Sequence, residues 1–183
     1  MMTAAAFLLG IVLWPALEYG LHRILAHTVT FKNKFRTEHL KHHAHRDYFA
    51  GGLDKLLAAV PSSAAMFLAA WAVSGAVSIA LAFTVGFLAS YLFYEWVHKR
   101  FHTHAPPHAL GLRLRKHHFI HHFADPRSNH GVTTTLFDHV FGTLRTAEQV
   151  AIPKAFVPLW MFEPGNGDRI AEAYRADFRL TAS

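Results

Sequence analysis

The chain has 183 residues, of which 52% are hydrophobic and only 16% charged, whereas an ordinary soluble domain has roughly 25% charged residues. Its length fits one domain, and its apolar composition indicates a membrane protein. The chain has no cysteine, which excludes disulfides, thiolate zinc sites, cysteine-bound iron–sulfur clusters and thiol nucleophiles. The net charge of +6 does not indicate nucleic-acid binding, because the basic residues flank apolar spans and do not line a recognition helix.

The first element expected from the amino terminus is a membrane helix. Residues 1–17 carry no charged side chain, and the apolar character continues to about Leu25. About 20 residues suffice for one span, so we predict a transmembrane helix over residues 4–25, kinked at Pro15. The basic start and small-residue cleavage site of a signal peptide are both missing from this segment.

A longer apolar stretch follows, with 39 consecutive uncharged residues from Leu56 to Tyr94. As one helix it would measure about 58 Å, roughly twice the hydrocarbon core of a bilayer. We therefore predict two spans, over residues 56–74 and 76–97, with a turn at Ser74 and Gly75. A buried soluble hairpin is the alternative, but it would need a larger polar partner than this chain offers.

The basic residues predict how these spans are oriented. All 18 lysines and arginines lie outside residues 1–22 and 56–94, so with three spans they fall on one side, which the positive-inside rule makes cytoplasmic. The 16 histidines follow the same division, with His22 at the cytoplasmic end of the first span and His98 at that of the third. The fold class is therefore all-α, an integral membrane protein with about three transmembrane helices and a cytoplasmic, histidine-rich helical cap.

Four histidine clusters flank the spans: HRILAH from His22, HLKHH from His39, HKRFH from His98 and HFIHH from His118. Residues three and four apart share one helix face, so we expect the three histidines of each HxxHH cluster to project towards a common point. Imidazole is the commonest protein ligand for Zn, Fe, Cu and Ni. The predicted metal ligands, which are also the predicted catalytic residues, are His22, His27, His39, His42, His43, His98, His102, His118, His121 and His122.

Ten imidazoles exceed what one metal can use, so we predict two metals with four or five nitrogens each. Two or three of the ten are alternatively outer groups, His22 first among them, because its spacing to His27 is the least regular. His117 competes with His118, but only His118 has the HxxHH register. We expect the remaining histidines to be outer, solvated or structural residues; they are His45, His104, His108, His130 and His139.

Metal-bound imidazoles usually donate their other N–H to a carboxylate or carbonyl. Glu18, Glu95 and Asp138 are the carboxylates best placed for this, although each could equally cap a helix end.

We divide the single domain, residues 1–183, into its spans, metal-binding regions at 22–55 and 98–147, and an interfacial tail at 148–183. Within the tail, the spacing of Ile170, Tyr174 and Phe178 predicts an amphipathic surface helix.

The clusters, in their order around an apolar hairpin, resemble the fatty acid hydroxylase/sterol desaturase superfamily of membrane di-iron oxygenases. The resemblance covers roughly residues 18–147 and includes NHGVTTTLFDHVFGT, which is similar to that family's signature after the last histidine box. It implies two iron ions that activate O2 and hydroxylate or desaturate a C–H bond of a fatty acyl, sphingolipid, sterol or carotenoid substrate. The ten histidines above are the ligands it implies, and the pattern looks closest to the fatty acid and sphingolipid hydroxylases.

This expectation is chemically coherent. An unactivated C–H bond needs a redox-active metal, so zinc is excluded as the working ion even where it replaces iron in a purified sample. The lipid enters from the bilayer, whereas the electrons must come from a separate donor of the ferredoxin or cytochrome b5 type with its reductase. A basic surface could dock that donor, although anchoring to anionic lipids is the simpler explanation; it comprises Lys41, Arg46, Arg113, Arg115 and Lys116.

Two features depart from the family pattern. Family members commonly have four spans, whereas the first hairpin here is reduced to one helix, and Phe137 stands where tryptophan is frequent. The main rival is a membrane metal transporter or metal-binding protein, but its site would lie near the bilayer midplane, and no histidine falls between residues 46 and 97. A membrane zinc hydrolase is disfavoured because HExxH is missing and ten histidines exceed its needs.

Overall fold

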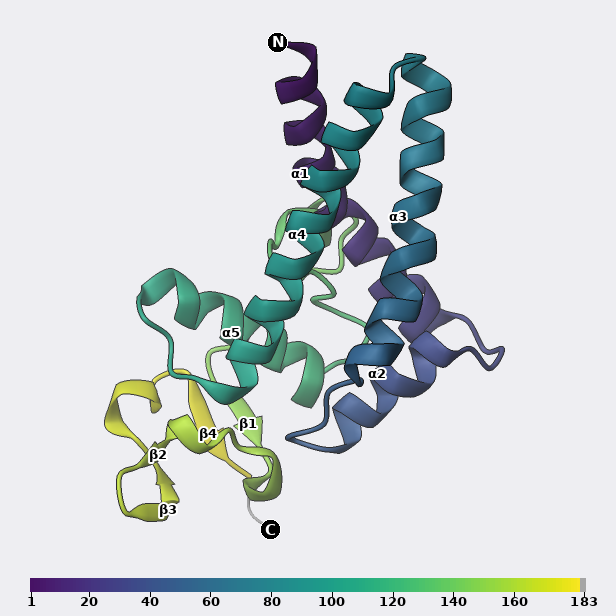
Figure 1. Cartoon of the computed structure of the whole chain (residues 1–183). Coiled ribbons are helices and arrows are strands. Elements are labelled where there is room, and N and C mark those ends of the chain that lie inside the picture. The colour runs from purple at the N-terminus through teal and green to yellow at the C-terminus, as the bar shows by residue number, and fades with distance from the viewer. Residues whose placement is uncertain (182–183) are drawn as a thin grey trace. The chain divides into compact units, whose positions relative to one another are not determined.

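A computed structural model describes residues 1–181 of the chain, and most of them are helical (Figure 1). The chain divides into two compact units. The first unit contains Met1–Glu18 and Ala50–Trp96, and the second contains Tyr19–Phe49 and the chain from Val97 onward.

The long apolar helices are α1 (Met2–Gly20), α3 (Gly52–Ser74) and α4 (Val77–Thr103). Together with the helical residues that follow α1, they give three candidate membrane spans, Met2–Thr28, Gly52–Ser74 and Val77–Thr103. The expected helical membrane fold is therefore confirmed.

Within the first unit, α1 packs closely on α4. A Cβ atom on Gly10 would lie 2.1 Å from the carbonyl oxygen of Phe83, and one on Gly86 would lie 2.0 Å from that of Phe7. Glycine therefore permits the approach of the two backbones at both positions, as small residues do between membrane helices. The α3–α4 turn lies where the sequence predicts it, at Gly75, whose φ of 66° favours glycine.

The second unit carries the histidine clusters, and the HKRFH cluster with His98 and His102 lies at the end of α4. A π-helix, Leu21–Thr28, continues from α1 and is followed by α2 (Lys34–Ala44), α5 (Ala109–Phe123) and α6 (Leu136–Val140). Asn33 caps α2, because its side chain accepts a hydrogen bond from the N–H of Arg36 at 2.8 Å. His108 caps α5 in the same way, with its Nδ1 accepting from the N–H of Gly111 at 3.0 Å.

The tail folds as a small lobe. The prediction of an amphipathic helix in this part of the chain is therefore wrong. Its strands are β1 (Val150–Ile152), β2 (Phe162–Glu163), β3 (Asn166–Ile170) and β4 (Phe178–Leu180), with β1–β4 parallel and β2–β3 antiparallel. Single 3₁₀ turns occupy Lys154–Phe156, Leu159–Met161 and Glu172–Tyr174. Residues 182 and 183 of the predicted tail lie outside the described part of the chain.

The tail forms strands because its apolar side chains pack against α5. Phe178 and Ile170 are 1% and 5% exposed and belong to one hydrophobic core with Phe119 and Ile120 of α5. Along β4, Phe178 is buried and Arg179 exposed, which is the two-residue alternation of a strand. The tail thereby covers one face of the helix that carries the last histidine cluster.

Candidate metal centre

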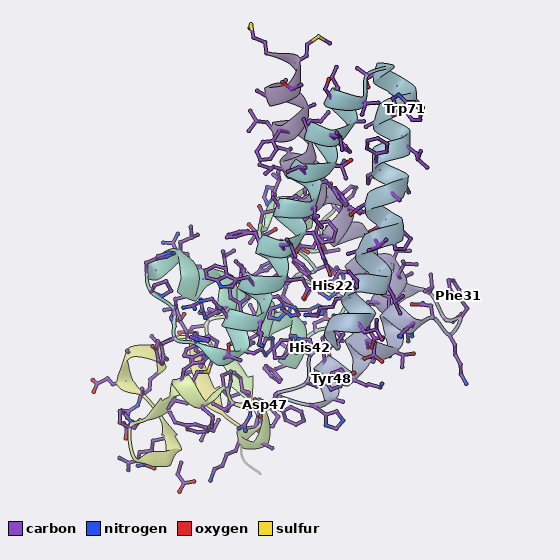
Figure 2. All side chains as sticks on the ribbon, viewed as in Figure 1. His22, Phe31, His42, Asp47, Tyr48 and Trp71 are labelled. Atoms are coloured by element: carbon purple, nitrogen blue, oxygen red, sulfur yellow. The ribbon has the colours of Figure 1, made fainter. Side chains whose placement is uncertain are left out.

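The ten predicted ligand histidines form two groups of five in the second unit. In each group, one ring nitrogen per residue lies within 4.8 Å of the others. The first group contains His22, His27, His39, His43 and His121, and the second contains His42, His98, His102, His118 and His122. His22 and His42, one from each group, are labelled in Figure 2.

In the first group, the imidazole Nε2 atoms lie close to one another. His39 Nε2 lies 3.1 Å from that of His22, 2.9 Å from that of His27 and 2.8 Å from that of His43. His121 Nε2 lies 2.9 Å from His22 Nε2 and 3.1 Å from His43 Nε2. Five side chains from three helices thus converge on one point.

In the second group, the Nε2 atoms of His102 and His118 are 2.9 Å apart. The ring of Phe49 packs against His42 and His102, at centroid distances of 5.1 and 5.8 Å. The two groups adjoin each other, because the rings of His43 and His122 stack with centroids 4.0 Å apart and an interplanar angle of 8°.

The π-helix explains the irregular spacing of the first cluster. In a π-helix, residues five apart are neighbours along the hydrogen-bond ladder, whereas in an α-helix they are not. His22 and His27 are five apart in the π-helix Leu21–Thr28, and their rings lie 5.2 Å apart in the same group. His22 is therefore a central member of the first group, at hydrogen-bonding distance from two others.

Each HxxHH cluster divides between the two groups, so the prediction of one common point per cluster is wrong. In α2, His39 and His43 belong to the first group and His42 to the second. In α5 the arrangement is reversed, since His118 and His122 belong to the second group and His121 to the first. Consecutive helical residues are about 100° apart around the axis, so adjacent histidines diverge towards two neighbouring centres.

Backbone carbonyls orient three of these rings. The Nδ1 atoms of His22, His121 and His42 hydrogen-bond to the carbonyl oxygens of His130, Ser128 and Tyr48, respectively. A carbonyl only accepts, so each ring carries its proton on Nδ1, and a neutral imidazole then has a lone pair at Nε2. The lone pairs of His22 and His121 consequently face each other across 2.9 Å.

Burial favours the neutral form of five predicted ligand imidazoles that lie outside the candidate spans. It lowers the pKa of His43 to about 3 and lowers the pKa values of His39, His118, His121 and His122 well below the usual value, with neighbouring histidines adding to the effect. Neutral imidazole is the form that binds a metal.

This donor set fits a metal ion in each group. Opposed lone pairs repel unless a cation lies between them, and nitrogens at adjacent corners of an octahedral site with bonds of about 2.1 Å are about 3.0 Å apart. His122 Nε2 is, moreover, buried without a hydrogen-bond partner within residues 1–181, which is costly for nitrogen in the absence of a ligand.

Asp138 does not accept a hydrogen bond from any of the ten histidines in the described contacts, contrary to its predicted role. It accepts instead from the N–H groups of His130 and Gly131, both at 2.8 Å, from the Thr143 hydroxyl at 2.7 Å, and from His117 Nε2 at 3.1 Å. Burial alone would raise its pKa, but these hydrogen bonds outweigh burial and hold the pKa below its usual value.

Asp138 therefore fixes the loop that precedes α6. The same loop supplies the carbonyls of Ser128 and His130 that orient His121 and His22. Asn129 between them is fully buried with φ of 56°, and its side chain donates to the carbonyls of His117 and Arg145. The NHG sequence signals such a loop, because asparagine and glycine tolerate unusual backbone angles, but sequence alone does not show which rings its carbonyls meet.

The other predicted positions have different surroundings. His117 faces Asp138 and not the second group, which resolves the choice in favour of His118. Glu95 forms an ion pair with Lys55, and Glu18 is buried. His130 is buried with its ring 5.3 Å from that of His22, whereas His45, His104 and His139 are exposed.

Comparisons with known proteins agree with the histidine arrangement. Residues 7–143 match the family model described as Fatty acid hydroxylase. The dihydroceramide fatty acyl 2-hydroxylase FAH2 of Arabidopsis thaliana is 32% identical over 139 residues, which cover 74% of this chain and 58% of that protein. The human fatty acid 2-hydroxylase is 30% identical over 144 residues, covering 75% of this chain and 39% of that protein.

A solved structure of full-length scs7p, in which only the hydroxylase domain is visible, superposes with a TM-score of 0.65 at 28% identity. The superposition covers 79% of this chain and 56% of that one. The chain thus spans between about two fifths and three fifths of the length of these relatives.

Proposed function

Because the chain belongs to the fatty acid hydroxylase family, we propose that it hydroxylates the acyl chain of a membrane lipid, using O2 and two iron ions. The names of the relatives favour carbon 2 of a fatty acyl chain in a sphingolipid over the sterol, carotenoid and desaturation alternatives. The observation that carries the proposal is the pair of adjoining five-histidine groups.

In this proposal the ten histidines are the iron ligands. Bound iron would supply the redox chemistry that O2 activation needs, which zinc does not provide. The protein contributes neutral imidazoles, whose rings are fixed before the metal binds. For His22 and His121, hydrogen bonds to backbone carbonyls fix the orientation. Because the ligands carry no charge, they would leave the positive charge of bound metals uncompensated.

Phe49 supports a second role of the chain, the exclusion of water. Its ring packs on His42, His98 and His102 at centroid distances of 5.1 to 6.1 Å. An apolar ring against three ligands shields one side of the second group from solvent, and removal of water strengthens electrostatic interactions inside a site.

We further propose that the site faces the cytoplasm and that a separate protein delivers the electrons. The one-sided distribution of the lysines and arginines supports the orientation. The predicted docking surface needs one correction: Arg115 is only 2% exposed and donates to the carbonyls of Arg100, His104 and Gly111. It stabilises the second unit and is not available to a partner.

Lipid analysis tests the proposed reaction. Cells that produce the protein are compared by mass spectrometry with cells that produce the His118→Ala variant, and fragmentation locates any added oxygen. We expect sphingolipids with one additional oxygen at carbon 2 of the acyl chain only in the first culture. A product that has lost two hydrogens would contradict hydroxylation, and an identical lipid profile in both cultures would contradict the reaction as a whole.

A further inference from the structure

The lobe formed by residues 148–181 carries an open surface cavity of about 500 Å³ that is separate from the histidine groups. Arg169, Arg175 and Arg179 line it, over an apolar floor that includes Ile170 and Phe178. No aspartate or glutamate is among its lining residues in the described part of the chain. The cavity also lies beyond residues 7–143, which match the family model.

Two of the three arginines of this cavity, Arg169 and Arg179, differ from the other cations of the lobe. Lys154 pairs with Asp168, and Arg175 with Glu163. The side chains of Arg169 and Arg179, in contrast, form no hydrogen bond or ion pair within residues 1–181, although carboxylates are present elsewhere in the lobe. The lobe therefore leaves two guanidinium groups available on one cavity.

The strands hold these two arginines in place. Arg169 precedes the buried Ile170 in β3, and Arg179 follows the buried Phe178 in β4. Alternation along a strand turns both side chains away from the core. Arg179 is also paired in register with Ala151 of β1, so the β1–β4 pairing holds the backbone at Arg179 in place.

The unpaired positive charges of Arg169 and Arg179 repel each other, and an anion bound between them would offset that repulsion. The planar guanidinium group presents paired N–H donors that match the oxygens of a phosphate, and such charge-assisted hydrogen bonds are among the strongest in proteins.

We propose that Arg169, Arg175 and Arg179 form a binding site for a phosphoryl group in the carboxyl-terminal lobe. The group belongs either to a soluble phosphate compound or to the headgroup of an anionic lipid, and the chemistry of recognition is the same for both. This site is independent of the proposed hydroxylation, because none of its residues belongs to the histidine groups.

The test uses the full chain in phosphatidylcholine nanodiscs and measures binding of inorganic phosphate and pyrophosphate by microscale thermophoresis. We expect saturable binding that weakens with salt and that falls by about tenfold or more in the double variant Arg169→Gln/Arg179→Gln. Arg113→Gln is the matched control, because Arg113 is exposed on α5 and does not line the cavity; its affinity should be unchanged.

A second arm identifies the source of the phosphate. Native mass spectrometry of the detergent-purified protein compares the retention of phosphatidic acid with that of phosphatidylcholine in the same variants. Selective, arginine-dependent retention of phosphatidic acid assigns the site to a lipid headgroup, whereas arginine-dependent binding of the soluble anions alone assigns it to a free phosphate compound. No saturable binding of either class, or equal binding by the double variant, would overturn the proposal.

The variant Arg169→Lys/Arg179→Lys provides a test should the glutamine variant fail to fold. It keeps both charges and removes the paired donors, so it should bind more weakly than the unmodified chain. Equal affinity for phosphate in this folded variant would also overturn the proposal.

Discussion

The Nε2 atoms of His22 and His121, residues 99 positions apart in the chain, lie 2.9 Å from each other in the interior of the second unit. Both rings donate their Nδ1 proton to a backbone carbonyl, so neither neutral ring has a second proton to share. This pair of opposed lone pairs is the strongest local reason to expect a cation in the first group.

Substitution of His121 tests the role of that pair. His121→Ala removes a fully buried ring from the first group, so we expect metal content to fall by about one ion per chain and hydroxylated product to disappear. Membrane insertion, measured by cell fractionation, should be unchanged. His139→Ala is the control, because His139 is exposed and outside both groups. Unaltered turnover in His121→Ala would remove His121 from the site.

Asp138→Asn tests the loop that orients the ligands. The asparagine side chain has one accepting oxygen and one donating amide, whereas Asp138 accepts from four donors. At least one buried donor would lose its partner, at a cost of about 1–3 kcal/mol. We expect lower thermal stability and weaker metal binding by the first group, measured by metal titration.

Asp168→Asn is the control for that change, because Asp168 is 75% exposed and lies in the tail lobe. Equal metal affinity in Asp138→Asn and Asp168→Asn would show that the loop does not position the ligands.

The pKa values of the histidines predict how stability depends on pH. In the unfolded chain a histidine titrates near 6.5, whereas burial lowers the pKa of His43 to about 3 and that of His39 and His121 well below its usual value. Below pH 6.5 the unfolded state therefore binds more protons than the folded state. In the metal-free protein, the contribution of these neutral rings to stability should be fully present above this pH and should decrease as the pH falls towards 3.

Thermal unfolding of the metal-free protein at a series of pH values measures this effect. A melting temperature that does not change between pH 7 and pH 5 would contradict the neutral, buried state of these rings.

Gly10→Ala tests the packing of α1 on α4. The new Cβ would lie 2.1 Å from the Phe83 carbonyl oxygen, so the helices must separate, at a cost of about 1–3 kcal/mol. Gly20→Ala is the matched control at the end of the same helix, because a Cβ there meets no atom within 4 Å. The two variants should differ in melting temperature in detergent, and equal values would refute the close approach.

The sequence predicts the membrane helices and the gathering of the ten histidines well, because both depend on local patterns. An uncharged run such as Leu56–Tyr94 has few structural solutions, and histidines at three- and four-residue spacing need only a helix to bring them together. The same reasoning places the α3–α4 turn at Gly75, where the chain needs a positive φ.

The division of the histidines into two groups depends on tertiary structure and could not be predicted in this way. His42 and His43 are adjacent in sequence but belong to different groups, because α2 lies between two centres. The position of His27 beside His22 requires the π-helix, which no residue between them signals. The tail strands likewise depend on α5, since Phe178 of β4 and Phe119 of α5 are buried in the same hydrophobic core.

Metal stoichiometry tests the central claim most directly. The protein is purified, stripped of metal, loaded anaerobically with excess ferrous iron, freed of unbound ions and analysed by mass spectrometry for iron per chain. Two groups of five histidines predict about two iron ions per chain, and about one in the His121→Ala variant. A value of one in the unmodified chain after complete loading would contradict the dinuclear centre.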